Sequence, residues 1–357
     1  MSNGSFMELE ASSIWWDQVG SSLVLLRRLR RCFGSDRSVV LHTGGRLPWR
    51  QTFAQRLRLE AGRYGDGRSL NAHPAGECAD PGDYLMNAYC SAKERQAYFP
   101  SQSSAEYLVS LRGQLLHQEL VWVENIRTPA ALQRWAEFVR QYEKAARRAD
   151  LDRQAMFLLE YAGPAREIPG LEPVRYALGE YDCHVFCLEA AGELEGPDWL
   201  RQYMAELALR LGGGDPERCA ALLAVGETLA RDPLTAAADL PDPMEREDAE
   251  SAVRRAQIVQ VFPVLEEYRM ELIDRRRELL EDRLCRSPRV LDSEGKPVTE
   301  VQELEIAALR YIVRGSDRFS GAEAHHLDLC RDVRNQLAHN DQVPFEEVKR
   351  LMEEPGF

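Results

Sequence analysis

Short apolar runs alternate with helix-patterned segments over the first two thirds of the chain. Four such runs predict buried β-strands: 38–42, 120–125, 156–161 and 184–188. Apolar positions at helical spacing predict helices at 49–59 and 129–148, between strands. Strands that are apolar along their whole length and separated by helices are typical of a parallel sheet covered on both faces. We therefore predict an α/β domain with a parallel sheet and helices on both of its faces.

Helical patterns continue after the last predicted strand and end at a change in composition. Residues 199–211 and 216–229 predict helices, separated by the glycine run 212–214, that would form a helical lid on the α/β domain. Residues 239–250 contain two prolines, few apolar residues and many acids, which predicts a linker. We therefore expect the first domain to span residues 1–238.

The remaining residues, 251–357, have a wholly helical pattern. Apolar positions recur every three or four residues in four segments: 252–285, from 299 on, 321–338 and from 345 on. Pro263 predicts a kink or a break in the first helix, and Thr299 with Gln302 predicts a capping box at the start of the second. Four helices with short connections predict an all-α, antiparallel four-helix bundle as the second domain.

Length and charge narrow the classes of partner. The chain has 357 residues, enough for two domains that each bury a core. Its net charge of -13 opposes indiscriminate binding to nucleic acid, because phosphate neutralisation needs clustered lysines and arginines. Any RNA would have to be a defined target or be delivered by a partner. The chain begins without a signal pattern and no apolar run approaches about 20 residues, so we expect a cytoplasmic protein without a membrane partner.

The cysteines and two of the histidines predict structural roles. The eight cysteines lack a CxxC pair and predict buried thiols. The nearest pair, Cys183 and Cys187, flanks His184 and would hold a metal only with two further ligands, so we expect no metal site. His325 and His326 are adjacent and predict a solvated helix face, with a place in an RNA groove as the alternative.

The strand predicted at 38–42 leads into a glycine turn and then a helix, which is the order of a phosphate-binding loop. When the pattern GxxxxGK[ST] is laid on this turn, Gly44 takes the first position and Trp49, Arg50 and Gln51 take the last three. A tryptophan prevents the close backbone approach that the second glycine allows. An arginine keeps the charge of the lysine but not its compact ammonium. The loop is therefore degenerate at the positions that matter most.

Further residues complete this candidate nucleotide site. A hydroxyl for magnesium is displaced to Thr52, and Glu124 ends an apolar run as the acid of a Walker B strand does. The candidate residues are Gly44, Gly45, Arg50, Thr52 and Glu124. The order of elements over about residues 20–235 resembles the core of AAA or STAND-type P-loop ATPases, in a degenerate form. ATP is thus an open candidate ligand, and an α/β domain without a nucleotide site is the alternative.

The predicted helix 321–338 carries a second candidate site near its end. Asn335 and His339 are four residues apart and share a helix face, and Arg334 lies one step round from Asn335. The buried stripe is supplied by other residues: Leu327, Cys330, Val333 and Leu337. Asn340 is suited to a left-handed helix cap. His339 is therefore expected at an exposed helix end.

These residue types match the needs of RNA cleavage without a metal. A histidine titrates near neutrality and serves as a base or an acid towards the 2′-hydroxyl. An arginine stabilises charge on the phosphorane, and an asparagine orients the histidine or the arginine. Because one helix end offers few groups, two copies that meet across a two-fold axis would make a fuller site.

The sequence Arg334-Asn335-x-x-x-His339 resembles the R-x4-6-H motif of the HEPN superfamily, in its Arg-Asn form, with similar flanking residues. The resemblance covers about residues 250–357. It implies a homodimeric, metal-independent endoribonuclease that needs no cofactor, with catalytic residues Arg334, Asn335 and His339. Joined to a P-loop-like domain, it resembles prokaryotic toxin or antiphage defence proteins in which the first domain senses or regulates and a protein partner or antitoxin restrains the activity.

Three alternatives remain open from sequence. In the first alternative, Arg334 and His339 only cap the helix and pair with Asp332 or Asp341 on a dimer surface. In the second alternative, the C-terminal domain is a non-catalytic HEPN adaptor that dimerises or recruits a partner. In the third alternative, the chain is a nucleotide-driven regulator that acts through its first domain.

Overall fold

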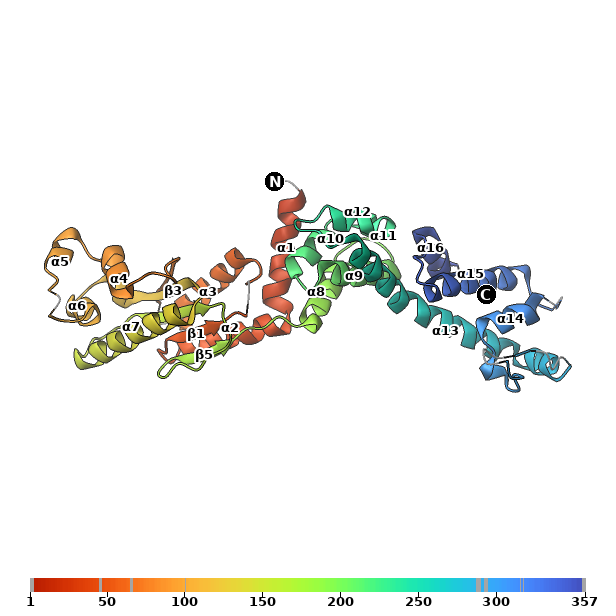
Figure 1. Ribbon diagram of the computed structural model, residues 1–357, viewed down its shortest axis with the longest axis horizontal. Helices are drawn as coiled ribbons and strands as arrows, with labels where there is room; N and C mark the ends of the chain where they lie inside the picture. The colour runs from red at the N-terminus through yellow and green to blue at the C-terminus, as the bar shows by residue number, and fades with distance from the viewer. Residues whose placement is uncertain are drawn as a thin grey trace. The chain divides into compact units, whose positions relative to one another are not determined.

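The computed structural model of the protein describes residues 3–44, 47–64, 67–99, 101–286, 290–291, 295–314, 316 and 318–354, with side chains from Glu10 on. It divides into two compact units, residues 1–182 and 183–357. The first unit contains a β-sheet, and the described part of the second is helical (Figure 1). The predicted order of an α/β region followed by a helical region is confirmed at this level.

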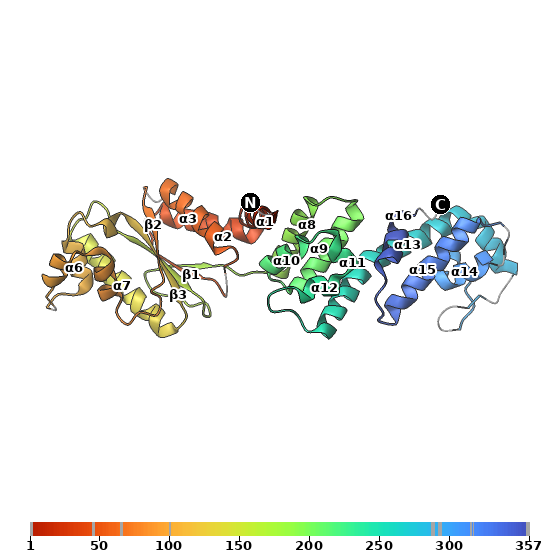
Figure 2. The same cartoon turned by 90° about the horizontal axis from the view of Figure 1, so that it is seen from above.

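The sheet of the first unit has five parallel strands in the order β2-β3-β4-β1-β5 (Figure 2). Its strands are β1 (Val39–His42), β2 (Ser69–His73), β3 (Glu119–Ile126), β4 (Met156–Tyr161) and β5 (Glu172–Arg175). The three strands that lie inside the sheet match the predicted runs at 38–42, 120–125 and 156–161. The two outermost strands were not predicted, because they carry exposed and polar residues.

The fourth predicted strand, 184–188, is wrong. These residues lie inside the helix α8 (Glu180–Gly192), which begins at the boundary between the two units. A short apolar run fits a buried strand and one turn of a buried helix equally well. The helix buries Cys183, Phe186 and Cys187 on one side, at three- and four-residue spacing.

Helices cover both faces of the sheet, as predicted for apolar parallel strands. On one face, Trp135 and Tyr142 of α7 pack in one core with Phe157 of β4. On the other face, the ring of Phe53 in α3 lies 5.6 Å from that of Trp122 in β3. The helices of this unit are α1 (Asn3–Gln18), α2 (Gly20–Phe33), α3 (Arg50–Tyr64), α4 (Pro81–Tyr89), α5 (Ala92–Gln96), α6 (Ser104–Ser110), the 3-10 turn η1 (Leu115–Gln118) and α7 (Pro129–Arg148).

In the second unit, a group of helices that the sequence assigned to the first domain packs on the long helix α13. The group consists of α9 (Asp198–Gly212), α10 (Pro216–Leu223), α11 (Glu227–Arg231) and α12 (Pro233–Ala238), and α13 spans Arg246–Arg286. Gln257 of α13 donates to the hydroxyl of Tyr203 in α9 (3.2 Å) and to the carbonyl of Val343 (2.7 Å). The division between units therefore falls at 182/183, whereas the sequence placed a linker at 239–250. The second half of that segment is already the start of α13.

The C-terminal part of α13 shares one core with the elements that follow it: η2 (Val301–Glu303), α14 (Ile306–Arg314), α15 (Gly321–Ala338) and α16 (Phe345–Glu353). The bounds of α15 and α16 match the predictions. The predicted capping box at Thr299 is wrong, because the helix starts at Ile306. Arg269 donates to the carbonyls of Gln302 (2.9 Å) and Leu304 (3.1 Å), so these groups are satisfied without a helix.

The predicted kink at Pro263 is also misplaced. The non-helical residue within α13 is Arg276 (φ -113, ψ 15), thirteen residues further on, while Pro263 lies inside the helix. Pro263 is exposed, so the carbonyl that loses its helical partner can be hydrated instead. Arg276 donates to Glu323 of α15 through Nε (2.9 Å) and Nη2 (2.7 Å), which places the irregular backbone where the two helices are joined.

Candidate functional site

Both ends of α15 have well-defined caps. At the start, the Ser320 hydroxyl accepts from the Glu323 N–H (3.1 Å), and the Glu323 carboxylate accepts from the Ser320 N–H (2.7 Å). At the end, Asn340 has φ +64, and the Asp341 N–H donates to the Gln336 carbonyl (2.9 Å). The left-handed cap expected at Asn340 is therefore confirmed. The helix stops abruptly and leaves His339 as its C-cap residue.

The buried face of α15 is complete without the candidate residues. The predicted stripe of Leu327, Cys330, Val333 and Leu337 is 0–3% exposed. Arg334 and His339 are exposed, and Asn335 is half-buried. Within the described part of the chain, the His339 imidazole makes no hydrogen bond. Packing therefore does not explain why these polar groups lie at this helix end.

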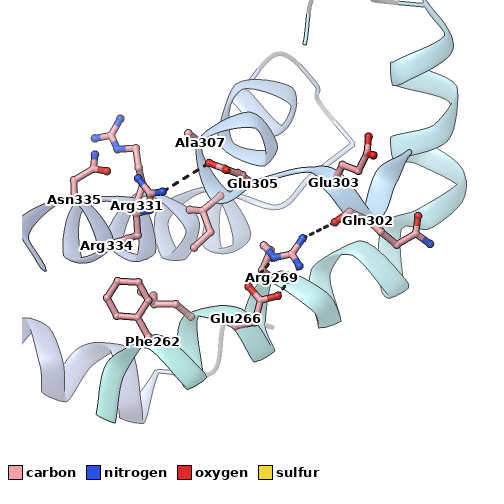
Figure 3. Close-up of a pocket in the computed structure, with 12 residues that line it drawn as sticks. Phe262, Glu266, Arg269, Gln302, Glu303, Glu305, Ala307, Arg331, Arg334 and Asn335 are labelled. Carbon is pink, nitrogen blue, oxygen red and sulfur yellow. Dashed lines mark hydrogen bonds and ion pairs between the residues drawn. The ribbon is translucent and has the colours of Figure 1, made fainter. Parts of the chain in front are cut away.

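Arg334 and Asn335 line a pocket of about 360 Å3 between α13, η2 and α15 (Figure 3). His339 does not line it. Nη2 of Arg334 lies 3.7 Å from Oε2 of Glu305, and these side chains are 44% and 53% exposed. An ion pair this long and this exposed is weak, so the guanidinium keeps most of its capacity to bind an anion.

The sequence pointed to Arg334 and Asn335 but not to a third pocket residue, Arg331. Arg331 precedes Asn335 by four residues, so Arg331, Asn335 and His339 form one row along the helix. This spacing was the signal that could have identified it. Arg331 donates to the neighbouring Asp332 through Nε (2.9 Å).

The structure does not contain the ion pairs of the purely capping alternative. Asp332 pairs with Arg331, and Arg334 pairs with Glu305. Among the described residues, neither Asp332 nor Asp341 makes an ion pair with Arg334 or His339.

One arginine that lines the pocket, Arg269, is already paired with an acid. Arg269 donates through Nε to Glu266 (2.9 Å) and through Nη1 to the Gln302 and Leu304 carbonyls. The hydrogen bond from Arg269 holds the pKa of Glu266 below its usual range, although partial burial opposes the shift. Of the three arginines that line the pocket, Arg334 therefore has the longest ion pair.

The two adjacent histidines of α15 have different environments. His325 is exposed, and one of its ring nitrogens lies 2.9 Å from Nη2 of Arg350. His326 is only 7% exposed, and its ring lies 4.4 Å from that of Tyr268. Burial lowers the pKa of His326, which favours the neutral imidazole. The expectation of a solvated face is thus correct for His325 and wrong for His326.

The candidate nucleotide site lies at the carboxyl ends of β1, β3 and β4. Arg50, in the lysine position of the loop, donates to Glu124 (2.8 Å) and to Glu160, two carboxylates whose side chains are 17% and 8% exposed. Its guanidinium lies 4.7 Å from the ring centre of Trp122. Arg50 and Glu124 are thus brought together, as the pattern predicted. However, the arginine is bound by two acids, which leaves it little capacity for a phosphate.

The remaining residues of this site point elsewhere. Gly44 has φ +62, a conformation that favours glycine, and Gly45 lies outside the described residues. The Thr52 hydroxyl donates to the hydroxyl of Ser12 in α1 (3.0 Å). A pocket of about 330 Å3 lies beside Arg50, between Leu47 and the strand ends.

Aromatic residues of α1 cover the segment that precedes α3. Trp16 is fully buried and donates to the Pro48 carbonyl (3.0 Å). Trp49 is 8% exposed, has φ +43, and lies 6.1 Å from Trp15 between ring centres. A phosphate-binding loop presents open backbone N–H groups to its ligand. Here indole rings pack against the described residues that precede α3.

The cysteines and acids give no coordination site. All eight cysteines are free thiols, and Cys183 donates to the Gly214 carbonyl (3.1 Å). In the part of the chain that the structure describes, no group of three or more His, Cys, Asp or Glu side chains is arranged to hold a metal ion.

Comparisons with family models and with curated proteins give no match. Across the described residues, no helix is both long enough and apolar enough to span a bilayer. Function must therefore be inferred from the side chains and their surroundings.

Proposed function

We propose that the chain is a metal-independent endoribonuclease whose catalytic groups are Arg334, Asn335 and His339 at the end of α15. One observation carries this proposal: the three side chains lie on the solvent side of a helix whose buried stripe is complete without them. Arg334 and Asn335 open onto a pocket, and His339 is exposed one turn further along. The resemblance to the HEPN motif supports the same assignment.

In the proposed reaction, His339 takes the proton from a ribose 2′-hydroxyl as the 2′-oxygen attacks the adjacent phosphorus. The bond between phosphorus and the 5′-oxygen breaks, and that oxygen leaves as a 5′-hydroxyl after it receives a proton. The products are a 2′,3′-cyclic phosphate and a 5′-hydroxyl end. Arg334 stabilises the charge on the phosphorane, and Asn335 orients the imidazole or the phosphate.

The proposed active form is a homodimer, because one helix end supplies only one histidine, while leaving-group protonation needs a second acid. A second copy related by a two-fold axis would bring its own His339 to the same phosphate. Two exposed apolar residues on α13, Ile258 (39%) and Val259 (47%), support an interface on this unit. We further propose that the first unit senses or regulates, and that a protein partner or antitoxin restrains cleavage.

The test is cleavage of single-stranded RNA by the full chain, with and without a chelator. We expect cleavage that survives chelation, yields 2′,3′-cyclic phosphate ends, and falls at least about 100-fold in His339→Ala, because a general base contributes roughly that much. The matched control is His325→Ala, which removes another exposed imidazole from the same helix and should keep activity. Intact RNA with a folded, dimeric wild-type protein would exclude the nuclease proposal.

A non-catalytic adaptor is the second candidate function, and one observation favours it. His339 does not line the pocket that Arg334 and Asn335 share. An adaptor would dimerise or bind its partner through the same surface without cleaving RNA. The nucleotide-driven regulator is less well supported, because Arg50 is paired with two carboxylates.

A further inference from the structure

Arginines are concentrated in the part of the chain that forms α2, β1 and α3. Residues 20–64 contain ten arginines and only two acids, Asp36 and Glu60, whereas the whole chain has a net charge of -13. The rest of the chain is therefore strongly acidic, and this region of the first unit is strongly basic. Such a charge asymmetry within one protein is typical of a surface that binds a polyanion.

The two acids of this region are already paired, so they do not neutralise its other arginines. Glu60 of α3 accepts from Nε of Arg30 in α2 (2.7 Å), and Asp36 lies 2.8 Å from Nη1 of Arg68. The pair between Arg30 and Glu60 also joins α2 to α3. The exposed sides of these two helices therefore belong to one continuous part of the first unit.

Five arginines on the exposed sides of α2 and α3 form what is here termed the arginine surface. Among the described residues, their side chains make neither an ion pair nor a hydrogen bond: Arg27, Arg28 and Arg31 of α2, and Arg58 and Arg63 of α3. Arg31 follows Arg27 by four residues and Arg28 by three, so these three are neighbours on the helix. Like charges at this spacing destabilise a helix. Stability of the fold therefore does not explain the arrangement.

The surroundings of these arginines favour a nucleic acid over a membrane. A helix that lies in a bilayer surface inserts its apolar face. In α2 that face, which includes Leu25, Leu26 and Leu29, is buried inside the unit. Exposed apolar and aromatic residues are instead scattered among the arginines, with Val24 on α2 and Tyr64 at the end of α3. Surfaces that bind single-stranded nucleic acid combine basic residues with such side chains.

We propose that the arginine surface binds the phosphate backbone of the single-stranded RNA that the second unit cleaves. A guanidinium donates two parallel N–H groups to one phosphate, and contacts of this kind carry no sequence information. The inference rests on the proposed ribonuclease function and assigns substrate recruitment to the first unit. It also accounts for RNA binding by a chain of net charge -13, because the positive charge that binding needs is gathered locally.

The first experiment measures binding without cleavage. The probe is a fluorescent single-stranded RNA of about 20 nucleotides with a 2′-O-methyl group on every ribose, and anisotropy gives its association constant at several salt concentrations. Each phosphate neutralised on a single strand contributes about -0.7 to the slope of log K against log salt. Replacing Arg27, Arg28 and Arg31 together with glutamine should reduce the slope by about 2 and weaken binding at least about 10-fold at 0.1 M salt. Replacing them with lysine should keep most of the slope.

The matched control replaces Lys144, Arg147 and Arg148 with glutamine. These residues are exposed on α7, which covers the opposite face of the sheet, and the control changes the net charge by the same amount. Its slope should equal that of the wild type, and equal losses in the two triple variants would contradict the inference. Wild-type protein that binds vesicles containing phosphatidylserine but not this RNA would assign the surface to a membrane instead. Binding to neither probe would also overturn the inference.

The second experiment separates recruitment from catalysis. The glutamine variant of Arg27, Arg28 and Arg31 should raise KM for RNA cleavage at least about 10-fold and leave kcat unchanged, because these contacts are equal in substrate and transition state. His339→Ala should show the opposite pattern, with lost kcat and unchanged binding of the methylated RNA. A fall in kcat in the arginine variant contradicts recruitment. Salt-dependent binding by a wild-type protein that cleaves no RNA refutes the nuclease proposal and leaves the arginine surface as a binding site.

Discussion

Arg50 and Arg334 are both arginines that the sequence singles out as phosphate ligands, but their surroundings differ. Arg50 lies between two carboxylates that are 17% and 8% exposed, over the ring of Trp122. Arg334 has one partner, Glu305, at 3.7 Å, and both side chains are about half exposed. The first arginine neutralises buried acids of its own unit, whereas the second can still bind an anion. Spacing along a sequence does not distinguish these two cases.

The same contrast separates two histidines of α15. His326 is buried against Tyr268, and His339 is exposed at the helix end. A buried polar side chain serves the fold, and removing it changes stability. An exposed polar side chain with few partners can be changed at little cost to the fold. The difference between buried polar side chains and exposed ones with few partners therefore predicts which substitutions affect cleavage and which affect unfolding.

The largest expected effect is on catalysis. Arg334→Ala should lower RNA cleavage about 100-fold, which is typical for loss of one charge-stabilising donor. The free energy of unfolding should change by less than about 1 kcal/mol, because exposed ion pairs contribute little. Arg246→Ala, which removes an arginine that is 84% exposed in the same unit, is the control and should affect neither quantity. If Arg334→Ala instead lowered stability and left cleavage unchanged, Arg334 would serve the fold in the same way as Arg50.

The second expected effect is on stability. Arg50→Ala should lower the free energy of unfolding of the first unit by about 2–4 kcal/mol, because it leaves one buried carboxylate, Glu160, and one half-buried carboxylate, Glu124, without their cation. Replacing Glu160 with glutamine in the same chain should recover part of this loss. Arg127→Ala, at the edge of the same pocket, is the control. Urea unfolding measures the free energy of unfolding of the single variant, the double variant and the control. An unchanged midpoint for Arg50→Ala would mean that its ion pairs are dispensable.

The smallest expected effect concerns pH. Burial lowers the pKa of His326, with His325 acting in the same direction and Glu354 opposing it. Below about pH 6.5 the unfolded chain binds a proton that the folded chain does not, so stability falls as the pH drops towards the folded pKa. His326→Phe should remove this contribution and gain stability relative to the wild type between pH 7 and pH 5. His325→Phe should not, and parallel curves for wild type and His326→Phe would contradict the assignment.

The fold was predictable where strands are apolar and not where they are polar. The inner strands β1 and β4 are buried throughout, and β3 is buried except at Glu124 and Asn125, so continuous apolar runs located all three. The outer strand β2 contains only exposed and half-buried residues, such as Asn71 and His73, and its pattern resembles a loop. The run at 184–188 was ambiguous, because five residues, four of them apolar, cannot distinguish a strand from a helix turn.

Only the part of the candidate site that lies on a single helix, α15, could be predicted from the sequence. Helical periodicity places Arg334, Asn335 and His339 at the end of α15, and Asn340 indicates where that helix stops. The pocket is also lined by Arg269 of α13 and Gln302 of η2, which lie far away in sequence and are placed beside α15 only by the packing of these elements. Likewise, no local pattern shows that Arg50 faces Glu160, 110 residues further on.

Helix α13, 41 residues long, limits how this protein can exchange parts during evolution. Tyr203 of α9 hydrogen-bonds to its first half, and Trp199 of α9 packs against Phe345, with ring centres 6.3 Å apart. A recombination event at the proline-rich segment near 240 would separate these partners and leave apolar surface on both products. One near residue 182 would keep them together. The heritable module that carries α15 therefore begins at the earlier boundary and includes α9.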